Sequence, residues 1–140
     1  RGAKSAHTLR QILEKREIDP EIAEAVIQRF IEVSLIDDHA YAETIVNSRR
    51  NFKGLAKSAI KRELSQKGVS AEIVEQVTES VTAEDEYDKA CELALKRVGR
   101  LAQLERDVRQ RRLNGYLARK GYSSSVVLAA VKVAEESLSN

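Results

Sequence analysis

The sequence predicts an all-α protein built from tandem three-helix repeats. One pattern of apolar residues occurs three times with identical internal spacing, the copies lying about fifty residues apart. The chain of 140 residues contains a single proline, so little interrupts helical segments. Aromatic residues make up only 4 % and tryptophan is absent, so the core consists mainly of Leu, Ile, Val and Ala. Such a core suits thin layers of helices.

Each copy of the pattern reads as a helix, a tight turn and a second helix. Two apolar residues four apart are followed by a break, a polar cap residue and a second apolar pair four apart. The first residue and the cap residue of each copy are, in chain order, Leu9 and Asp19, Ile60 and Ser70, and Leu113 and Ser123. Stacked units of this kind bury a shared core and present a long side surface, which favours a binding protein over an enzyme.

The turns carry their own signals. Pro20 follows Asp19, which is the order of a helix cap and a first helical residue. Gly68 and Gly121 stand two residues before the caps of the second and third copies, as in a left-handed helix C-terminus. The first copy has Glu17 at that place, so its turn is expected to close differently.

Further helices are predicted between the copies. One spans 37–52, with Asp37 as its cap and Asp38 in its first turn, and the other spans 84–98. If Ala42 corresponds to Ala90, the second and third units contain three helices each. The first unit contains two, and its leading helix is absent or lies before Arg1.

These elements give about eight helices and no strands in one domain, 1–140. The approximate units are 1–34, 35–81 and 82–140, and they are expected to form an elongated, gently curved array.

Composition limits the function classes. The net charge is only +2, so composition alone does not indicate a nucleic-acid-binding protein. The lone cysteine allows no internal disulfide and does not suggest an oxidising compartment. No apolar stretch approaches the roughly 20 residues of a membrane helix, and no secretory signal is visible.

The near-neutral total hides alternating charge blocks. Basic residues dominate 47–70 and 96–120, and acidic residues dominate 69–95. The functional interpretation is a patch that binds DNA phosphates or an acidic protein surface, and the alternative is ordinary solvated helix. The candidate patch residues are Arg49, Arg50, Lys53, Lys57, Lys61, Arg62, Lys67, Arg109, Arg111 and Arg112.

No catalytic or metal-binding constellation is evident. Two distant histidines and Cys91 cannot form a tetrahedral metal set, and Cys91 lies on an apolar helical stripe as a small hydrophobe. The scattered glycines form no phosphate-cradling loop, so no cofactor is expected. Phe30 and Phe52 are assigned to the core, and tyrosines such as Tyr122 are expected at unit interfaces with their hydroxyls at the surface.

Two runs of the second unit contain distinctive motifs. The run 35–42 contains an Asp-Asp and a Tyr-Ala pair, and the run 60–70 contains an Ile, Glu-Leu and Lys-Gly pattern. In these motifs the chain resembles the RecX family of regulatory proteins. The start of the chain and the segment 113–122 are similar to the family's first-unit and last-unit motifs. One departure is visible, because Ala56-Lys57 replaces a Gly-Pro-like pair and leaves the start of the basic helix open.

The resemblance implies a bacterial protein of the cytoplasm, built from tandem three-helix units. We expect it to be a monomer and, since no catalytic constellation is evident, not an enzyme. The resemblance also implies binding in the groove of the RecA recombinase filament on single-stranded DNA, which restrains filament growth, ATP hydrolysis and strand exchange. Its setting would be DNA recombination, DNA repair and the SOS response, with single-stranded DNA contacted secondarily or through RecA. The alternative from a different class is a helical repeat that binds nucleic acid directly.

Overall fold

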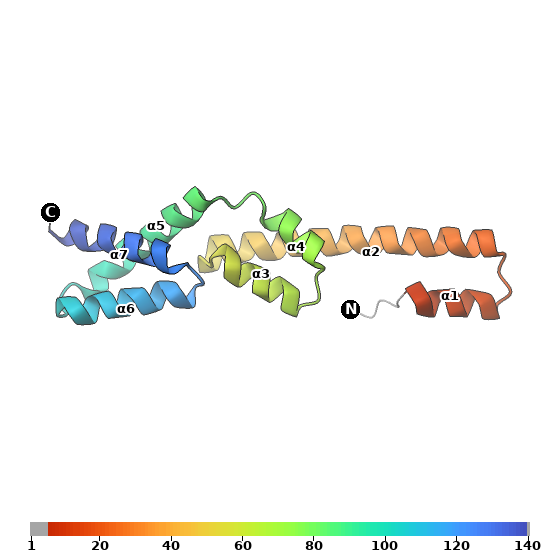
Figure 1. The fold of residues 1–140 in the computed structure, drawn as a ribbon, viewed down its shortest axis with the longest axis horizontal. Coiled ribbons are helices and arrows are strands. Elements are labelled where there is room, and N and C mark those ends of the chain that lie inside the picture. The colour runs from red at the N-terminus through yellow and green to blue at the C-terminus, as the bar shows by residue number, and fades with distance from the viewer. Residues whose placement is uncertain (1–5, 140) are drawn as a thin grey trace. The chain divides into compact units, whose positions relative to one another are not determined.

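The computed structural model describes residues 6–139, and within that range it contains seven α-helices and no strand (Figure 1). The helices are α1 (Ala6–Lys15), α2 (Pro20–Ser48), α3 (Lys57–Gln66), α4 (Ala71–Thr78), α5 (Ala83–Leu101), α6 (Arg106–Arg119) and α7 (Ser124–Leu138). A π-helical turn, η1 (Arg49–Lys53), follows α2. The predicted all-α class is therefore confirmed. The chain divides into two compact units, which meet between Tyr41 and Ala42 inside α2.

The second copy of the repeat closes with the hydrogen bonds of a Schellman turn. Gly68 has a φ of 85° and donates its N–H to the Ser65 carbonyl at 3.1 Å, and Val69 donates to the Leu64 carbonyl at 3.1 Å. The third copy repeats this arrangement around Gly121, whose φ is 98°. The left-handed glycines predicted from the sequence are confirmed, because glycine adopts a positive φ without a Cβ penalty.

The first copy closes in the same way, although it lacks the glycine. Glu17 has a φ of 53° and donates its N–H to the Glu14 carbonyl at 3.0 Å, and Ile18 donates to the Leu13 carbonyl at 3.2 Å. The expectation of a different turn was wrong. The left-handed conformation costs a non-glycine residue about 1–2 kcal/mol, which the two hydrogen bonds at the helix end offset.

The predicted caps begin the second helix of each copy. An Asp19 carboxylate oxygen accepts the backbone N–H of Glu21 at 2.9 Å, and Pro20 is the first residue of α2. The Ser70 and Ser123 hydroxyls accept backbone N–H groups at the starts of α4 and α7. These side chains satisfy helical donors that have no partner within the helix.

The predicted break at Asp37 is wrong, because α2 runs without interruption for 29 residues. Neither glycine nor proline occurs between Pro20 and Ser48, so nothing in the backbone forces a turn. Asp37 and Asp38 are helical residues rather than a cap and a first turn. The helix count is consequently seven instead of about eight over 6–139. The unit boundaries at 34 and 81 stay a prediction.

The unit from Ala42 onward contains two apolar clusters. The middle helical group, defined as α2 from Ala42 on, η1, α3 and α4, packs around the fully buried Ile60 and Leu64. The C-terminal helical group, defined as α5, α6 and α7, packs around the fully buried Leu113 and Leu117. Within the latter group α7 lies along α5, as Figure 1 shows. The repeat positions are thus the core positions.

The unit before Ala42 is a helix pair. Arg10 on α1 donates to the Glu24 carboxylate on α2 at 2.9 Å, and Ile27 on α2 is buried. Other apolar residues of α2 remain exposed, among them Ile22 at 59 % and Ile36 at 65 %. A single packed helix covers only one face of a long apolar helix.

Candidate partner-binding surface

The two helical groups after Ala42 are joined by the tyrosine of the third turn. The Tyr122 hydroxyl donates to the Gly54 carbonyl at 2.7 Å, and the Tyr122 side chain is only 6 % exposed. Burial raises the pKa of Tyr122 well above its ordinary value. The expectation that this hydroxyl lies at the surface was wrong, because the loop after η1 covers it. Tyr122 therefore anchors the C-terminal helical group to the middle one.

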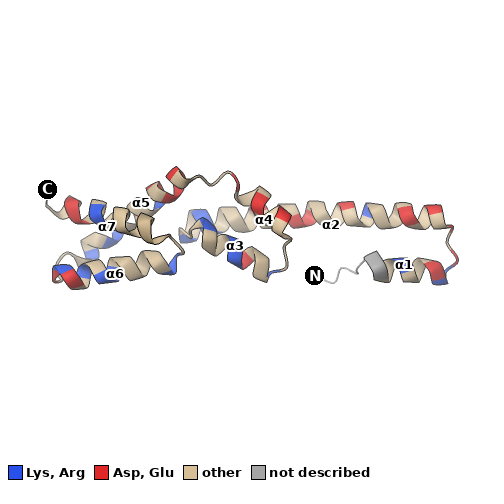
Figure 2. Cartoon of the chain, in the orientation of Figure 1, with Lys and Arg blue, Asp and Glu red and all other residues tan. Residues whose placement is uncertain are grey.

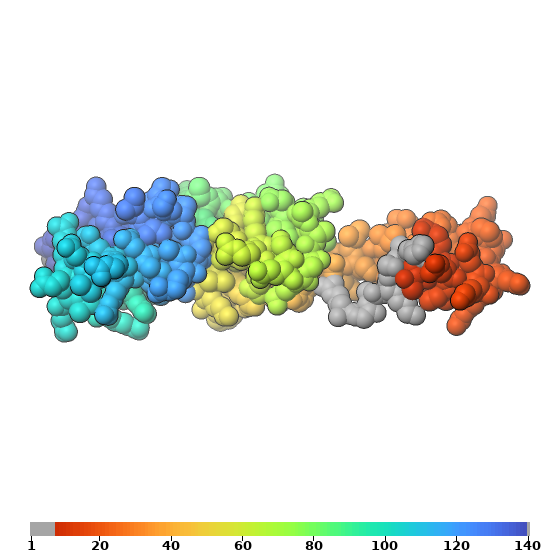
Figure 3. Space-filling view, turned by 60° about the horizontal axis from the view of Figure 1, so that its bottom comes forward, coloured from red at the N-terminus to blue at the C-terminus, as the bar shows by residue number. Residues whose placement is uncertain are grey.

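Backbone contacts extend this junction. The Ala56 N–H donates to the Lys120 carbonyl at 2.8 Å, and the Ser58 hydroxyl donates to the Gly121 carbonyl at 2.6 Å. A Cβ on Gly121 would lie 2.8 Å from the Ala59 Cβ, so this position requires glycine for close approach as well as for its φ. The end of α6 and the start of α3 consequently form one surface, which is continuous in the space-filling view (Figure 3).

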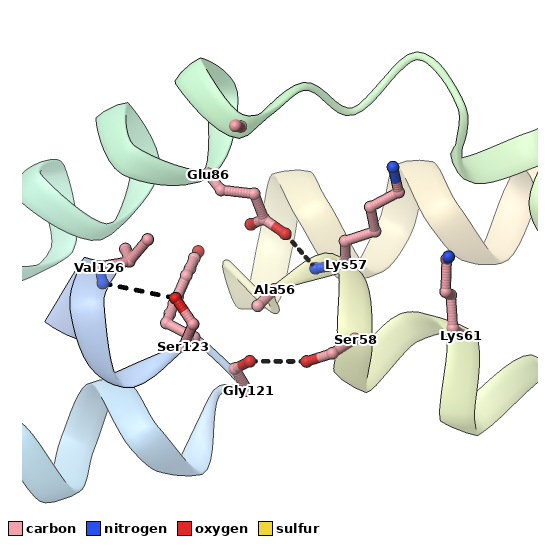
Figure 4. A pocket seen from close by; sticks show the side chains of 10 residues that line it. Ala56, Lys57, Ser58, Lys61, Glu86, Gly121, Ser123 and Val126 are labelled. Atoms are coloured by element: carbon pink, nitrogen blue, oxygen red, sulfur yellow. Dashed lines mark hydrogen bonds between the residues drawn. The ribbon is translucent and has the colours of Figure 1, made fainter.

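A hollow of about 560 Å³ lies at this junction (Figure 4). Glu86 reaches across it from α5 and accepts the backbone N–H of Lys57 at 2.6 Å. Ala56 offers no side-chain cap to α3, so the Glu86 carboxylate takes that role and fixes the start of α3 at Lys57. The Lys57 ammonium donates to the Val81 carbonyl at 3.1 Å. Lys57 thus contributes to the junction with both its backbone and its side chain.

Several residues of the first basic block form ion pairs with Glu63, the one acid inside the block, or with acids from other helices. Arg49 binds the Glu63 carboxylate through two hydrogen bonds of 2.7 and 2.6 Å, which lower the pKa of Glu63. Arg50 pairs with Glu86 at 3.2 Å, and both side chains are mostly buried. These arginines connect helices, because their partners lie on α3 and α5. Glu63 lies within the same basic block, whereas Glu86 lies 36 residues after Arg50 and only the packing of the helices brings it close.

The lysines of α3 are paired more loosely. Lys61 lies 2.7 Å from the Glu75 carboxylate on α4, and Glu75 is itself largely exposed. Lys67 lies 3.8 Å from Glu63, a long contact on the protein surface. Exposed pairs of this kind contribute little to stability and are screened by salt.

In the middle helical group, two members of the predicted patch carry exposed charges without an ion pair within residues 6–139. They are Lys53, at the end of η1, and Arg62, on α3. Phe52, beside Lys53, is 87 % exposed, so its assignment to the core was wrong. The π-helical turn directs this side chain outward, and such turns often occur at functional sites. An exposed aromatic ring beside a free cation is a typical anchor for a partner.

Arg109 is a structural residue of the third unit. It donates to both oxygens of Glu135 on α7 at 2.6 Å and to the Leu104 carbonyl at 2.9 Å. Both charged side chains are only 13 % exposed. The hydrogen bonds from Arg109 lower the pKa of Glu135. Arg109 therefore stabilises the C-terminal helical group and offers little to a partner.

Arg111 and Arg112 line a different place, which we call the arginine pocket. It is a hollow of about 300 Å³ in which they are joined by Arg97 and Arg119, with Leu101 and Gly115 completing the lining. The predicted patch did not include Arg97 and Arg119. Helical spacing could have indicated Arg119, since residues 112, 115 and 119 share one face of α6. Arg97 lies on α5, and only the packing of the two helices brings it there.

The middle and C-terminal helical groups carry both basic and acidic residues. Figure 2 shows basic residues on η1, α3 and α6, with acidic residues on α4 and at the start of α5. Among the described residues, no group of three or more His, Cys, Asp or Glu side chains could hold a metal ion. No described helix is long and apolar enough to span a membrane.

Two family models match the two helical groups. The model of the RecX second three-helix domain matches residues 37–77, and the model of the RecX third three-helix domain matches residues 84–131. The protein belongs to the RecX family. The regulatory protein RecX of Streptomyces coelicolor is 44 % identical over 128 residues, covering 91 % of this chain and 68 % of its own length. The RecX of Thermobifida fusca is 36 % identical over 132 residues, covering 94 % and 71 %.

Solved structures show the same fold. The crystal structure of RecX from Lactobacillus salivarius has a TM-score of 0.67 at 23 % identity, covering 95 % of this chain and 86 % of its own. A second crystal structure of regulatory protein RecX has a TM-score of 0.63 at 27 % identity, covering 92 % and 63 %. The three-helix organisation of this RecX-family chain is therefore that of known members.

Proposed function

We propose that this RecX-family protein is a non-catalytic regulator in the cytoplasm that binds the RecA recombinase filament. Binding would restrain filament growth, ATP hydrolysis and strand exchange in DNA recombination and repair. The observation that carries the proposal is the family membership, since the curated relatives are regulatory proteins. A protein that binds one state of a filament more tightly than another shifts the equilibrium by that difference, without chemistry of its own.

The charges left exposed by the fold support a binding role. Lys53 and Arg62 belong to the middle helical group and make no ion pair among residues 6–139, and Phe52 presents an apolar ring beside Lys53. Arg49, Arg50 and Arg109 are held by internal carboxylates instead. We therefore assign contact with the filament to the exposed cations. Rim charges of this kind act mainly on association rate and salt dependence.

Inhibition of the RecA ATPase tests this assignment. We expect Lys53→Glu with Arg62→Glu to raise the half-inhibitory concentration about tenfold, because charge reversal replaces attraction by repulsion. Lys15→Glu with Lys132→Glu is the matched control, since it reverses two exposed lysines on α1 and α7 that also make no ion pair within residues 6–139. Equal inhibition by the first variant and the wild type, both with unchanged helix content, would remove this surface from the proposed interface.

A second candidate function is direct binding of nucleic acid. The arginine pocket favours it, because guanidinium groups gathered in one hollow suit phosphate oxygens. Binding of the protein to immobilised single-stranded DNA, with and without RecA, separates the two functions. Under the leading proposal more of the protein binds when RecA covers the DNA. Tight binding to bare DNA that RecA does not change would favour the second function.

A further inference from the structure

The arginine pocket concentrates positive charge that the fold does not neutralise. Arg97, Arg111, Arg112 and Arg119 line one hollow of about 300 Å³ between α5 and α6. None of the four forms an ion pair with a carboxylate within residues 6–139, although Arg109 on the same helix is fully engaged by Glu135. Like charges held close together repel one another, so an anion in the hollow would relieve that repulsion.

Neighbouring contacts hold the pocket in shape. The Arg97 guanidinium lies over the Tyr116 ring at 4.5 Å, and the Lys120 ammonium lies 5.2 Å from the same ring. Burial and the nearby charges of Arg97 and Lys53 lower the pKa of Lys120, which reflects the positive potential here. A guanidinium stacked on a ring has lost part of its freedom before a ligand arrives, so less entropy is lost on binding.

Gly115 leaves room inside the pocket. A Cβ at this position would lie 3.0 Å from an Arg119 guanidinium nitrogen, so the missing side chain lets Arg119 fold back over its own helix. Glycine in a helix interior costs about 0.5–1 kcal/mol relative to alanine. At Gly115 this loss of stability accompanies a position that lets the Arg119 guanidinium reach the centre of the hollow.

We propose that the arginine pocket is a phosphate-binding site that takes two or more adjacent phosphate groups. Guanidinium forks donate parallel N–H bonds to phosphate oxygens, and the hollow has room for more than one such group. Single carboxylates on a peptide bring one charge each on a bulky, variable chain, and they would fill this volume with fewer anionic oxygens. The source of the phosphates is the backbone of single-stranded nucleic acid or a free polyphosphate.

The inference deepens the proposed function, because a RecA filament carries single-stranded DNA, but it is tested without RecA. Fluorescence anisotropy would follow a labelled thymidine oligonucleotide of about 20 nucleotides and its displacement by tripolyphosphate or by polyglutamate. For the wild type we expect displacement by tripolyphosphate at much lower concentration than by polyglutamate. A protein that binds tripolyphosphate but not the oligonucleotide would assign the pocket to a free phosphate compound.

Three variants separate a built site from general electrostatics. Arg111→Gln with Arg119→Gln should weaken binding about tenfold or more, because it removes charge-assisted hydrogen bonds. Lys15→Gln with Lys132→Gln removes the same charge from exposed, unpaired positions on α1 and α7 and should change affinity less than twofold. Arg111→Lys with Arg119→Lys keeps the charge, so a several-fold loss there identifies the guanidinium fork. Circular dichroism confirms that each variant is folded.

Several binding results would overturn the phosphate site. A wild type that binds neither oligonucleotide nor tripolyphosphate, or that polyglutamate displaces as readily, overturns the phosphate site. The site is also overturned if Arg111→Gln with Arg119→Gln lowers the affinity no more than the control variant does. The same holds if Arg111→Lys with Arg119→Lys binds as tightly as the wild type. RecA inhibition is a separate readout: an intact pocket in a protein that fails to inhibit RecA would refute the proposed function alone.

Discussion

Glu63, Glu86 and Glu135 decide which basic side chains of this protein are available. Each holds an arginine, and those arginines lie in sequence blocks that appear almost purely basic. The paired arginines connect helices, whereas Lys53 and Arg62 keep exposed charges. At the scale of single residues, ion-pair geometry therefore separates structural cations from those that can reach a partner.

The Arg109–Glu135 pair predicts a pH-dependent stability. The pKa of Glu135 is lowered in the folded protein, so the pair stabilises above the ordinary glutamate pKa and this contribution is lost as pH falls through the lowered value. We expect Glu135→Gln to cost about 1.5–3 kcal/mol at pH 7. Urea unfolding at pH 7 and at about pH 3 checks this. The difference in unfolding free energy between the two proteins should be smaller at the lower pH, and a constant difference would contradict the assignment.

Leu64 tests the repeat frame. Its side chain is fully buried in the middle helical group, at the position that the pattern assigns to the core. Leu64→Ala should lower the free energy of unfolding by about 2–5 kcal/mol, the range for a fully buried leucine. Chemical denaturation measures the loss, with the exposed Leu128→Ala as a control that should change stability little. Equal effects of the two substitutions would contradict the frame.

Residue type predicted the buried positions better than it predicted exposed or hydrogen-bonded ones. Leu64 and Leu117 follow from apolar spacing, because burial of such residues is the main driving force of folding. Phe52 does not, since only the π-helical turn directs its ring outward. Tyr122 does not either, because its hydroxyl partner lies 68 residues away in the sequence. Contacts of this range depend on how the helical groups pack, which no local pattern contains.

At the scale of elements, the start of α3 depends on another helix. The capping serines and Asp19 could be predicted from sequence because their partners are two or three residues away. The cap of α3 could not, because Glu86 reaches it from α5. In α2, by contrast, a local signal was misleading. An Asp-Asp pair can begin a helix, yet it does not break one when neither glycine nor proline accompanies it.

Removal of Glu86 should destabilise α3 first. Glu86→Ala deletes the acceptor for the Lys57 N–H and the partner of Arg50, so we expect a loss of about 1–2 kcal/mol, as for other caps. Glu86→Gln keeps an acceptor and should cost less. Hydrogen exchange at the first turn of α3 reports the effect directly. If amides there exchange no faster in Glu86→Ala, the carboxylate is not the cap.

At the scale of the whole molecule, three copies of one helix pair differ mainly in what surrounds them. All three turns share the same hydrogen bonds, including the one that uses Glu17 instead of glycine. The second and third copies gain a further helix and a buried core, whereas the described part of the first leaves apolar residues of α2 exposed. The repeat thus fixes the fold, and the proposed function uses exposed charges that the core does not need, such as those of Lys53 and Arg62.

Sedimentation of the protein with RecA filaments on single-stranded DNA, across a series of salt concentrations, tests the proposed function most directly. We expect the protein to sediment with the filament and the bound fraction to fall as salt rises. Lys53→Glu with Arg62→Glu should reduce the bound fraction most at low salt, where the exposed charges are least screened. A bound fraction that does not respond to salt or to this variant, or that is the same on bare DNA without RecA, would contradict the proposed function.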